Sequence, residues 1–433
     1  MTPSARLSAA IEIFADIEAR RRPAGDALKD WGLAHRYAGS GDRAAIAGLV
    51  YDALRRKSSS AWLMGEATPR AVLIGMLRRE RNADLAAIEA LCSGARYAPE
   101  ALTDAERTAL AADALAGAPA HVTGDYPEWL DPYLERVFGD ERADEGAALS
   151  SRAPLDLRVN TLAAERDDVL AALAHLKPEP ARWSPAGLRI RLAADAKSPA
   201  IHAEPVFLKG QIEIQDEGSQ LAALLAGAKP GEQVIDLCAG AGGKTLALAA
   251  AMENHGQIYA TDTDKRRLAP IHERLARSGA RNVQVRTPKS VGDTLADLAG
   301  RADLVLIDAP CTGTGTWRRN PDAKWRIRPG ALAERIKQQD AALDHAATLV
   351  KPGGRIAYVT CSVLAEENGD RVTAFIGRHP DFSVEKPGAV INTLGERAYL
   401  FSRAVLISGE GFQMTPRRTD TDGFFQSLLR RSS

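Results

Sequence analysis

The sequence predicts an α/β protein in which a doubly wound sheet domain follows a helical bundle and a small α+β subdomain. Three observations support this fold class. Residues after about 205 alternate short apolar strands with amphipathic helices, as doubly wound sheets do. A glycine-rich loop follows the first of these strands. Residues 1 to about 120 show helical apolar spacing instead.

Residues 1–124 are rich in Ala, Leu and Arg, and are predicted to form the helical bundle. Ile46, Leu49, Val50 and Leu54, for example, fall on one helix face. The basic groups of this segment permit two interpretations, solvated helix faces or a phosphate-binding surface, because Asp and Glu are interspersed among them. These groups are Arg20–Arg22, Arg36, Arg43 and Arg55–Lys57.

Residues 125–204 are predicted to form the α+β subdomain. Leu155–Asn160 and Leu188–Leu192 have the composition of strands, and Asp167–Leu173 has that of a helix. Two proline-containing stretches, Lys177–Pro185 and Ser198–Pro205, are predicted connectors. The second connector marks the expected boundary with the next domain.

Residues 205–433 are predicted to form the doubly wound sheet domain. A helix is expected over Lys265–Ser278, because Leu268, Ile271 and Leu275 share one face. The predicted strands are Val234–Leu237, Ile258–Ala260, Val283–Val285, Leu304–Ile307 and Ile356–Val359.

The composition excludes several classes of protein. With 433 residues, 45% of them hydrophobic, the chain is long enough for two or three domains with real cores. It has no signal-like start and no run near the roughly 20 apolar residues that a membrane helix needs, so a cytoplasmic protein without membrane contact is expected. Four cysteines without a Cys/His cluster predict free thiols and no metal.

The loop from Asp236 to Thr245 reads DLCAGAGGKT, in which the glycines permit a tight turn at a helix start. It is not a phosphate loop, because that motif needs glycine where Cys238 stands. Asp262 ends the second strand, 22 positions beyond Gly240, where a ribose hydroxyl would need a carboxylate. Together these features indicate an adenosine-type cofactor, and on these two features alone an NAD enzyme stays open.

Two cysteines also follow predicted strands of this sheet. Cys311 stands in Asp308-Ala309-Pro310-Cys311 and Cys361 in Thr360-Cys361-Ser362, fifty positions further on. Because parallel strands end at the same edge of a sheet, both thiols are expected at one edge. This arrangement favours covalent chemistry, and it has no obvious role in hydride transfer.

These motifs resemble those of the RsmB/Sun-type RNA 5-methylcytosine methyltransferases. The resemblance covers roughly residues 205–433. The amino-terminal bundle, with Ala38–Arg43, more loosely resembles the NusB-like RNA-binding domain of bacterial members. The matching segments of the sheet domain are DAPCTGTG from Asp308, YVTCS from Tyr358 with Glu366–Asn368, the loop Cys238–Thr245, NPDAKW from Asn320, TDGFF from Thr421 and QDEGSQ from Gln215.

The resemblance implies a Rossmann-like class I methyltransferase domain that uses S-adenosyl-L-methionine. Cytosine C5 is a poor nucleophile, so a thiolate must first add to C6, and the resemblance gives this role to Cys361. Cys311 would assist release of the product, and Asp308 would act between the methionine part and the target base. Lys244 is expected near the reacting centre. The cofactor-binding residues implied are Cys238, Ala239, Gly240, Ala241, Gly242, Gly243, Lys244, Asp262 and Asp308.

The expected partner is RNA. Ribosomal RNA of the small subunit, 16S, is the expected substrate, and transfer RNA is the alternative. The enzyme is expected to be a monomer. The target cytidine must be unpaired or flipped. Two other classes stay open: a DNA methyltransferase, which would attack with its Pro-Cys thiol, and a noncatalytic ribosome-assembly factor.

Two further expectations concern single segments. Trp317 and Trp325, flanked by basic residues, are predicted to face RNA, with a loop packed on the sheet edge as the alternative. The related family places an acidic residue shortly after the third strand, near the adenine, but no carboxylate occurs from Arg286 to Ser290. Asp293 is the first carboxylate. Either Asp293 reaches back from a remodelled loop or the adenine is held by backbone and apolar contacts, so the adenine contact is left unassigned.

Overall fold

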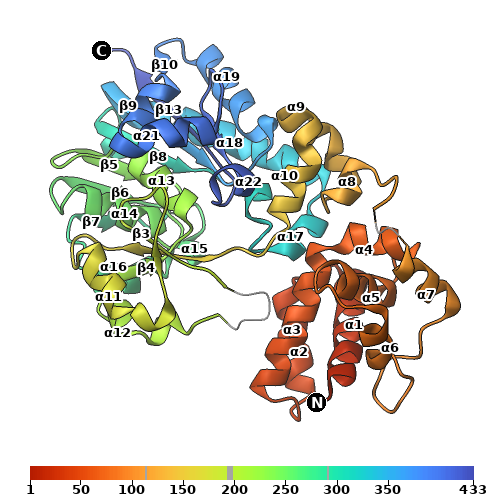
Figure 1. Cartoon of the computed structure of the whole chain (residues 1–433). Helices are drawn as coiled ribbons and strands as arrows, with labels where there is room; N and C mark the ends of the chain where they lie inside the picture. Colours follow the sequence, from red (N-terminus) through yellow and green to blue (C-terminus); the bar gives the residue numbers. More distant parts are fainter. Residues whose placement is uncertain (113–114, 193–197, 290–291) are drawn as a thin grey trace. The chain divides into compact units, whose positions relative to one another are not determined.

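The computed structural model describes residues 1–112, 115–192, 198–289 and 292–433 (Figure 1). Contacts between residues divide the chain into two compact units. The helical unit comprises Met1–Arg152 together with Trp317–Arg328, and the sheet unit comprises Ala153–Thr316 and Pro329–Ser433. Over the described residues, no helix is long and apolar enough to cross a membrane.

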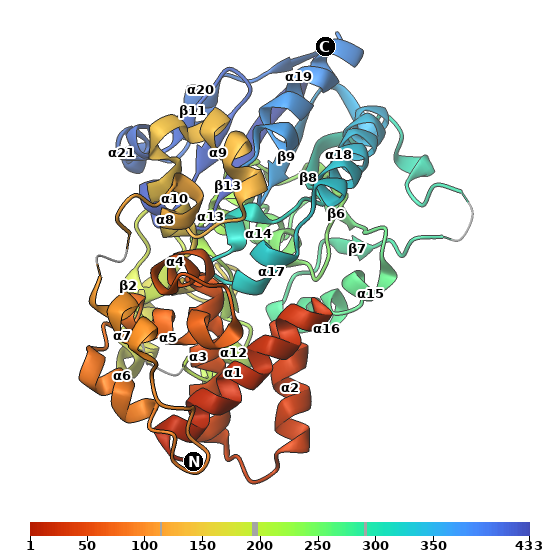
Figure 2. The same cartoon turned by 90° about the vertical axis from the view of Figure 1, so that its right-hand side faces the viewer.

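The helical unit is built around α1, α3 and α5, which lie side by side in Figure 2. Thr2 and Thr68 cap α1 and α5, and each is followed by proline in the first turn, where the missing N–H costs nothing. The predicted helix face around Val50 is buried in the core of this unit. Its helices are α1 (Pro3–Arg20), α2 (Ala24–Ala34), α3 (Ser40–Arg55), α4 (Lys57–Met64), α5 (Pro69–Arg79), α6 (Leu85–Leu91), α7 (Asp104–Ala111), α8 (Ala120–Thr123), α9 (Asp131–Phe138), α10 (Arg142–Leu149) and α17 (Pro321–Arg326).

Several basic groups considered for phosphate binding pair with carboxylates of the same unit. Arg20 contacts Asp16 at 2.8 Å, and Arg56 contacts Glu80 at 2.6 Å. Arg55 is buried. These contacts favour a structural role for these arginines within the bundle.

A four-stranded antiparallel sheet, in the order β2-β3-β1-β4, opens the sheet unit. Its core includes Leu157, Leu188 and Val169 of α11 (Arg166–Ala172). The strands are β1 (Leu155–Val159), β2 (Glu179–Pro180), β3 (Gly187–Ile190) and β4 (Ile212–Ile214). Strands β1, β2 and β3 lie within the predicted subdomain 125–204, whereas β4 follows residue 204 and residues 125–152 are largely helical.

The large sheet has the order β11-β12-β13-β9-β8-β5-β6-β7, with β10 paired to β13. Strands β5 to β9 are parallel, whereas β10 to β13 pair antiparallel. Neighbours such as Val234 and Ile235 belong to cores on opposite faces, as a sheet covered on both sides requires. The strands are β5 (Gln233–Asp236), β6 (Gln257–Ala260), β7 (Val283–Val285), β8 (Ala302–Asp308), β9 (Val350–Thr360), β10 (Phe382–Val384), β11 (Leu406–Ile407), β12 (Phe412–Met414) and β13 (Phe424–Arg431).

The predicted helix Lys265–Ser278 is wrong as one element. It is divided into α15 (Lys265–Leu268) and α16 (Ile271–Ser278), because Pro270 lacks the N–H that would continue the first helix. The other helices of the unit are α12 (Pro205–Leu208), α13 (Glu217–Leu225), α14 (Gly243–Ala251), α18 (Pro329–Leu349), α19 (Gly369–Arg378), α20 (Pro387–Asn392), α21 (Ala398–Ala404) and α22 (Pro416–Thr419).

Candidate active site

The glycine-rich loop joins β5 to α14 at the carboxyl edge of the parallel strands. Gly240 and Gly242 adopt positive φ angles of 50° and 84°, which residues with a Cβ atom rarely adopt. A Cβ at Gly242 would lie 2.5 Å from Cγ1 of Ile271, so α16 packs directly on this glycine. The loop is therefore held in one shape by its glycines and by α16.

Asp236 ends β5 and lies completely buried under this loop. Its Oδ2 accepts a hydrogen bond from Thr245 Oγ1 at 2.7 Å. Its Oδ1 has no hydrogen-bond partner among the residues that the structure describes. Burial raises the pKa of Asp236 to about 7, so this carboxyl group keeps its proton in mildly acidic solution.

Asp262 lies at the end of β6 and holds the glycine-rich loop. Its Oδ2 accepts from the Gly240 amide at 3.0 Å, and its Oδ1 accepts from the Asp264 amide at 2.9 Å. Asp264 caps α15, because its side chain accepts from the Arg266 amide. Asp262 is therefore not the helix cap.

A cavity of about 760 Å³ opens beside Asp262. Leu237, Pro288 and Pro310 provide apolar wall, and Thr261 and Asp262 provide polar groups. Of the predicted cofactor residues, Cys238 and Asp262 line this cavity, whereas Ala239–Lys244 and Asp308 do not. Burial raises the pKa of the Cys238 thiol far above its usual range, so this thiol keeps its proton in neutral solution.

The predicted residues Lys244 and Asp308 meet. Lys244, in the first turn of α14, is almost fully buried, and its Nζ donates to Asp308 Oδ2 at 2.7 Å. Its ammonium group also lies 5.1 Å from the ring centre of Phe424. Asp308 ends β8 and remains about one-third exposed, so its carboxylate is held by the lysine and still reachable.

The two predicted catalytic cysteines also meet, with their sulfur atoms 3.3 Å apart. The hydrogen bond with Cys361, followed by burial, raises the pKa of Cys311 well above its usual value. Either sulfur could donate the hydrogen bond between the two thiols, and the raised pKa of Cys311 favours the arrangement in which its protonated thiol faces the sulfur of Cys361.

Glu367 fixes the loop that carries Cys311. Its Oε1 accepts from the Thr312 amide at 2.8 Å, and its Oε2 accepts from the Thr312 hydroxyl group. Gln339 of α18 donates both to Glu367 Oε1 at 3.0 Å and to the Pro310 carbonyl at 2.9 Å. Sequence reasoning quoted Glu367 without giving it a role and missed Gln339, because their contacts join elements that are distant in the chain.

The loop that carries Cys361 is bonded in the same way. Thr360 Oγ1 donates to Asn368 Oδ1 at 2.5 Å, and Asn368 Nδ2 donates to the Ser362 carbonyl at 2.9 Å. The Gly315 amide donates to the Cys361 carbonyl at 2.9 Å, which joins the two cysteine loops. Both thiols therefore stand on loops fixed by buried polar side chains.

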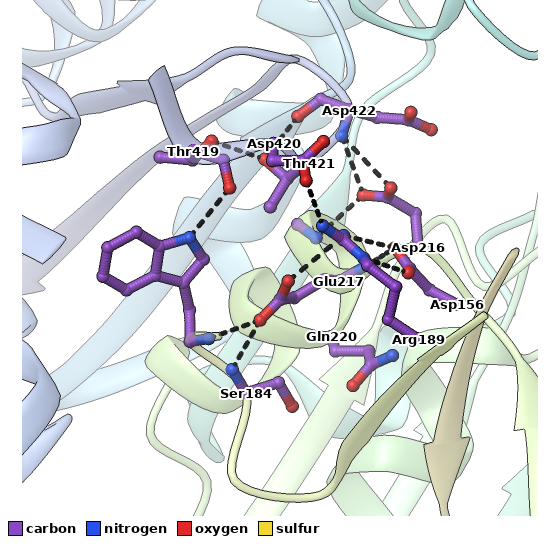
Figure 3. Close-up of polar contacts among 12 residues, drawn as sticks. Asp156, Ser184, Arg189, Asp216, Glu217, Gln220, Thr419, Asp420, Thr421 and Asp422 are labelled. Carbon is purple, nitrogen blue, oxygen red and sulfur yellow. Dashed lines mark hydrogen bonds and ion pairs between the residues drawn. The ribbon is translucent and has the colours of Figure 1, made fainter. Parts of the chain in front are cut away.

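The carboxy-terminal motif lies against this site through backbone contacts. The Gly423 amide donates to the Gly315 carbonyl at 2.8 Å, and a Cβ at Gly315 would lie 2.0 Å from the Gly423 oxygen. Asp216, at the start of α13, accepts from the Asp422 amide at 3.1 and 3.2 Å (Figure 3). The lead-in helix thus anchors the motif that packs on the Cys311 loop.

A buried charge network extends from this anchor to the small sheet (Figure 3). Arg189 of β3 donates to Asp156 of β1 at 2.7 and 2.9 Å, and it contacts Glu217 at 3.2 Å and Asp420 at 2.8 Å. Trp183 donates from its indole N–H to the Thr419 carbonyl at 2.8 Å. These contacts tie the small sheet to the carboxy-terminal segment.

The prediction that Trp317 and Trp325 face RNA is wrong. Trp317 is only 1% exposed, and Trp325 packs on the core of the helical unit and donates from its indole N–H to the Leu54 carbonyl at 2.7 Å. Lys324 is also buried and donates to Ser150 Oγ at 2.7 Å. Burial lowers the pKa of Lys324 to about 7. Packing within the helical unit, which sequence spacing could not reveal, explains this segment.

Comparison with known families gives two matches. Residues 222–430 match a family described as 16S rRNA methyltransferase RsmB/F, and residues 126–197 match an RsmF/B-like ferredoxin-like domain. The first match includes the loop Cys238–Lys244, Asp262, Cys311 and Cys361.

Individual relatives agree with these matches. The chain is 34% identical over 341 residues to ribosomal RNA small subunit methyltransferase B of Sodalis glossinidius, covering 77% of this chain and 69% of that one. It is 32% identical to a probable enzyme of the same name from Synechocystis, covering 71% of this chain and 67% of that one. A methyltransferase homolog protein from Pyrococcus horikoshii has a similar structure, with a TM-score of 0.58, 27% identity and coverage of 72% and 97%. NSun6 from the same organism, at 22% identity and a TM-score of 0.59, shares the fold over 71% of this chain and 98% of that chain.

Proposed function

Because the chain belongs to the RsmB/F family of S-adenosylmethionine-dependent ribosomal RNA methyltransferases, we propose that it methylates C5 of a cytidine in 16S ribosomal RNA through a covalent bond between Cys361 and C6. One observation carries this proposal: the sulfur atoms of Cys311 and Cys361 lie 3.3 Å apart. The two cysteines follow the carboxyl ends of β8 and β9, and β8 ends in Asp308, whose carboxylate pairs with Lys244.

The residues present fit the cofactor of this family. The cavity beside Asp262 is within the range of about 300–1,000 Å³ typical of small-molecule sites. Its apolar walls suit a nucleobase, and Asp262 lies where a ribose hydroxyl group can be bound. The loop Cys238–Lys244 borders the same end of the sheet and leads to Asp308. When bound, the cofactor supplies an electrophilic methyl group.

In the proposed reaction, Cys361 supplies the first bond. Its thiolate adds to C6 of the cytosine ring, and the electrons of the C5–C6 double bond move toward C5 and the ring at N3. Asp308, held by Lys244, stands to bind the N3 side and to hold a proton there as charge develops. Carbon 5 thereby becomes nucleophilic enough to accept the methyl group.

Release reverses the first bond. A solvent water molecule accepts the proton from C5, the electrons of the C5–H bond form the C5–C6 double bond again, and the bond between C6 and Cys361 breaks with its electrons on sulfur. Cys311, which keeps its own proton, donates a hydrogen bond to the departing thiolate. Its role is therefore to make Cys361 a better leaving group.

Methylation of defined RNA tests the proposal. Purified protein, S-adenosylmethionine with a labelled methyl group, and either 16S ribosomal RNA or transfer RNA would be incubated, and the RNA would be digested to nucleosides. We expect labelled 5-methylcytidine from the ribosomal RNA only, and bisulfite sequencing would locate it. Label at another base atom or on ribose would refute the cytosine chemistry, and label confined to transfer RNA would refute the proposed substrate.

A further inference from the structure

The small antiparallel sheet has one apolar face and one charged face. Along β1, Leu157 and Val159 belong to the apolar core of this sheet, whereas Arg158 between them points to the opposite face. Arg158 stands opposite Glu213 of β4 in the strand register. Both side chains are buried, so the charged face is covered by other parts of the sheet unit.

Glu213 binds two arginines of α16. Its Oε2 accepts from Nε and Nη2 of Arg274 at 3.1 and 2.7 Å, and its Oε1 accepts from Nη2 of Arg277 at 2.5 Å. Because two N–H groups of Arg274 meet one buried carboxylate, the planar guanidinium group is fixed in direction.

The third contact of Arg274 leads to the glycine-rich loop. Its Nη1 donates to the Ala241 carbonyl at 2.9 Å. The Gly242 amide, in the same peptide unit, donates to the Ala239 carbonyl at 2.8 Å. This peptide unit is therefore held at both ends, next to a glycine with a positive φ angle whose backbone could otherwise adopt several conformations.

Arg158 reaches the start of α14 from the same charged face. Its Nη2 donates to the Gly243 carbonyl at 3.4 Å, and its Nε donates to Gln215 Oε1 at 2.6 Å. Within the described ranges no side chain caps α14, so the first amides of this helix are left for a ligand. Lys244 follows Gly243 directly. Arginines thus hold the carbonyl groups on both sides of Gly242.

We propose that Arg274, oriented by Glu213, is a positioning residue for the cofactor: it fixes the Ala241–Gly242 peptide so that the loop amides and Lys244 are aligned before the cofactor binds. Arg274 is not among the described residues that line the cavity beside Asp262, so it acts through the loop. A loop ordered in advance binds a ligand more tightly, because it loses little conformational freedom on binding. The inference rests on the proposed function only for the identity of the cofactor.

Calorimetric binding of S-adenosylhomocysteine without RNA tests this inference separately from the cytosine chemistry. Arg274→Met keeps a long side chain but removes the bond to Ala241, and we expect binding about tenfold weaker, the effect of one hydrogen bond from a charged group. Arg277→Met is the matched control, because Arg277 also binds Glu213 but otherwise contacts the ring of Phe207. Its affinity should equal that of the unaltered protein.

Thermal melting separates positioning from a general loss of stability. Both variants should melt earlier, since each removes an ion pair with Glu213, but only Arg274→Met should bind weakly. Arg274→Lys keeps the charge beside Glu213 without the planar fork that spans carboxylate and carbonyl, so it should restore stability more than affinity. If Arg274→Met does not fold, Arg274→Lys is compared with Arg277→Lys in the same way. Unchanged affinity in the folded Arg274 variants would overturn the inference, as would equal losses in the matched Arg274 and Arg277 variants.

Discussion

In the proposed reaction, two thiols in contact have different roles. Their contact at 3.3 Å and burial raise the pKa of Cys311, so we assign the attack to Cys361 and the assistance of release to Cys311. The sequence placed both cysteines at one sheet edge. Their contact could be found only from the three-dimensional structure.

Removing each thiol should therefore stop the reaction at a different point. Cys361→Ala removes the attacking sulfur, and we expect neither methylation nor adduct. Cys311→Ala removes the group that assists release, and a covalent RNA complex should accumulate, visible as a denaturation-resistant shift on a gel. If the Cys361→Ala protein formed the adduct and the Cys311→Ala protein did not, the roles would be reversed.

Glu367 offers a second test at this scale. Glu367→Gln places an amide group where two donors of Thr312 now meet a carboxylate, so one donor loses its acceptor. We expect a loss of about 1–3 kcal/mol in the free energy of unfolding, measured by urea denaturation, and slower methylation at saturating RNA. Glu396→Gln, at an exposed position, is the control and should change neither quantity.

At the scale of single elements, the parallel strands were predicted closely and the rest less well. Apolar runs mark β5 to β8, but β9 begins six residues before the predicted strand because Pro352 and Gly353 look like a turn. The antiparallel strands β10 to β13 were not predicted, because their pairing depends on contacts between residues far apart in the chain. Local patterns alone could not place them.

The turn into α14 should tolerate no side chain at Gly242. Gly242→Ala forces a Cβ to 2.5 Å from Ile271 in a left-handed backbone conformation, which costs about 1–3 kcal/mol. We expect weaker binding of S-adenosylhomocysteine, by roughly tenfold or more, in calorimetry. Gly377→Ala on α19 is the matched control, because nothing lies within 4 Å of its added Cβ. Equal affinities in the two variants would contradict this account of the loop.

Strand β5 should make stability depend on pH through Asp236. Its folded pKa of about 7 lies above its ordinary value, so the folded protein holds a proton that the unfolded chain releases between about pH 4 and 7. Its contribution to stability therefore falls as pH rises through that range. Asp236→Asn cannot ionise, so the variant should gain stability relative to the unaltered protein as pH rises from 5 to 8. Urea denaturation at several pH values measures this difference, and a constant difference would contradict the buried, protonated carboxyl group.

At the scale of the whole molecule, the helical unit is completed by a segment from the middle of the chain. Residues 317–328 leave the sheet unit after the Cys311 loop and supply Trp325 and Lys324 to the helical unit. The motif of this segment could be recognised in the sequence, but its place in the helical unit could not. The burial of Lys324 depends on a partner more than 150 positions away in the chain.

Truncation tests this completion. A protein that lacks residues 1–152 would keep Lys324 and the two tryptophans of the segment but lose Ser150 and the core on which Trp325 packs. We expect it to aggregate or to expose these side chains, with much greater binding of a hydrophobic dye than the full chain shows. A soluble, dye-negative truncated protein with normal cofactor affinity would contradict this expectation.

The same segment sets an order of events during synthesis. The helical unit begins the chain, but its last packing residues emerge from the ribosome only after residue 328, which is 176 residues beyond Arg152 (328 − 152 = 176). At bacterial and eukaryotic elongation rates of about 5–20 residues per second, that delay is roughly 10–35 s. We therefore expect the nascent bundle to lack the side chains of Trp325 and Lys324 for that time, so that its first domain completes its core only after this segment has been synthesised.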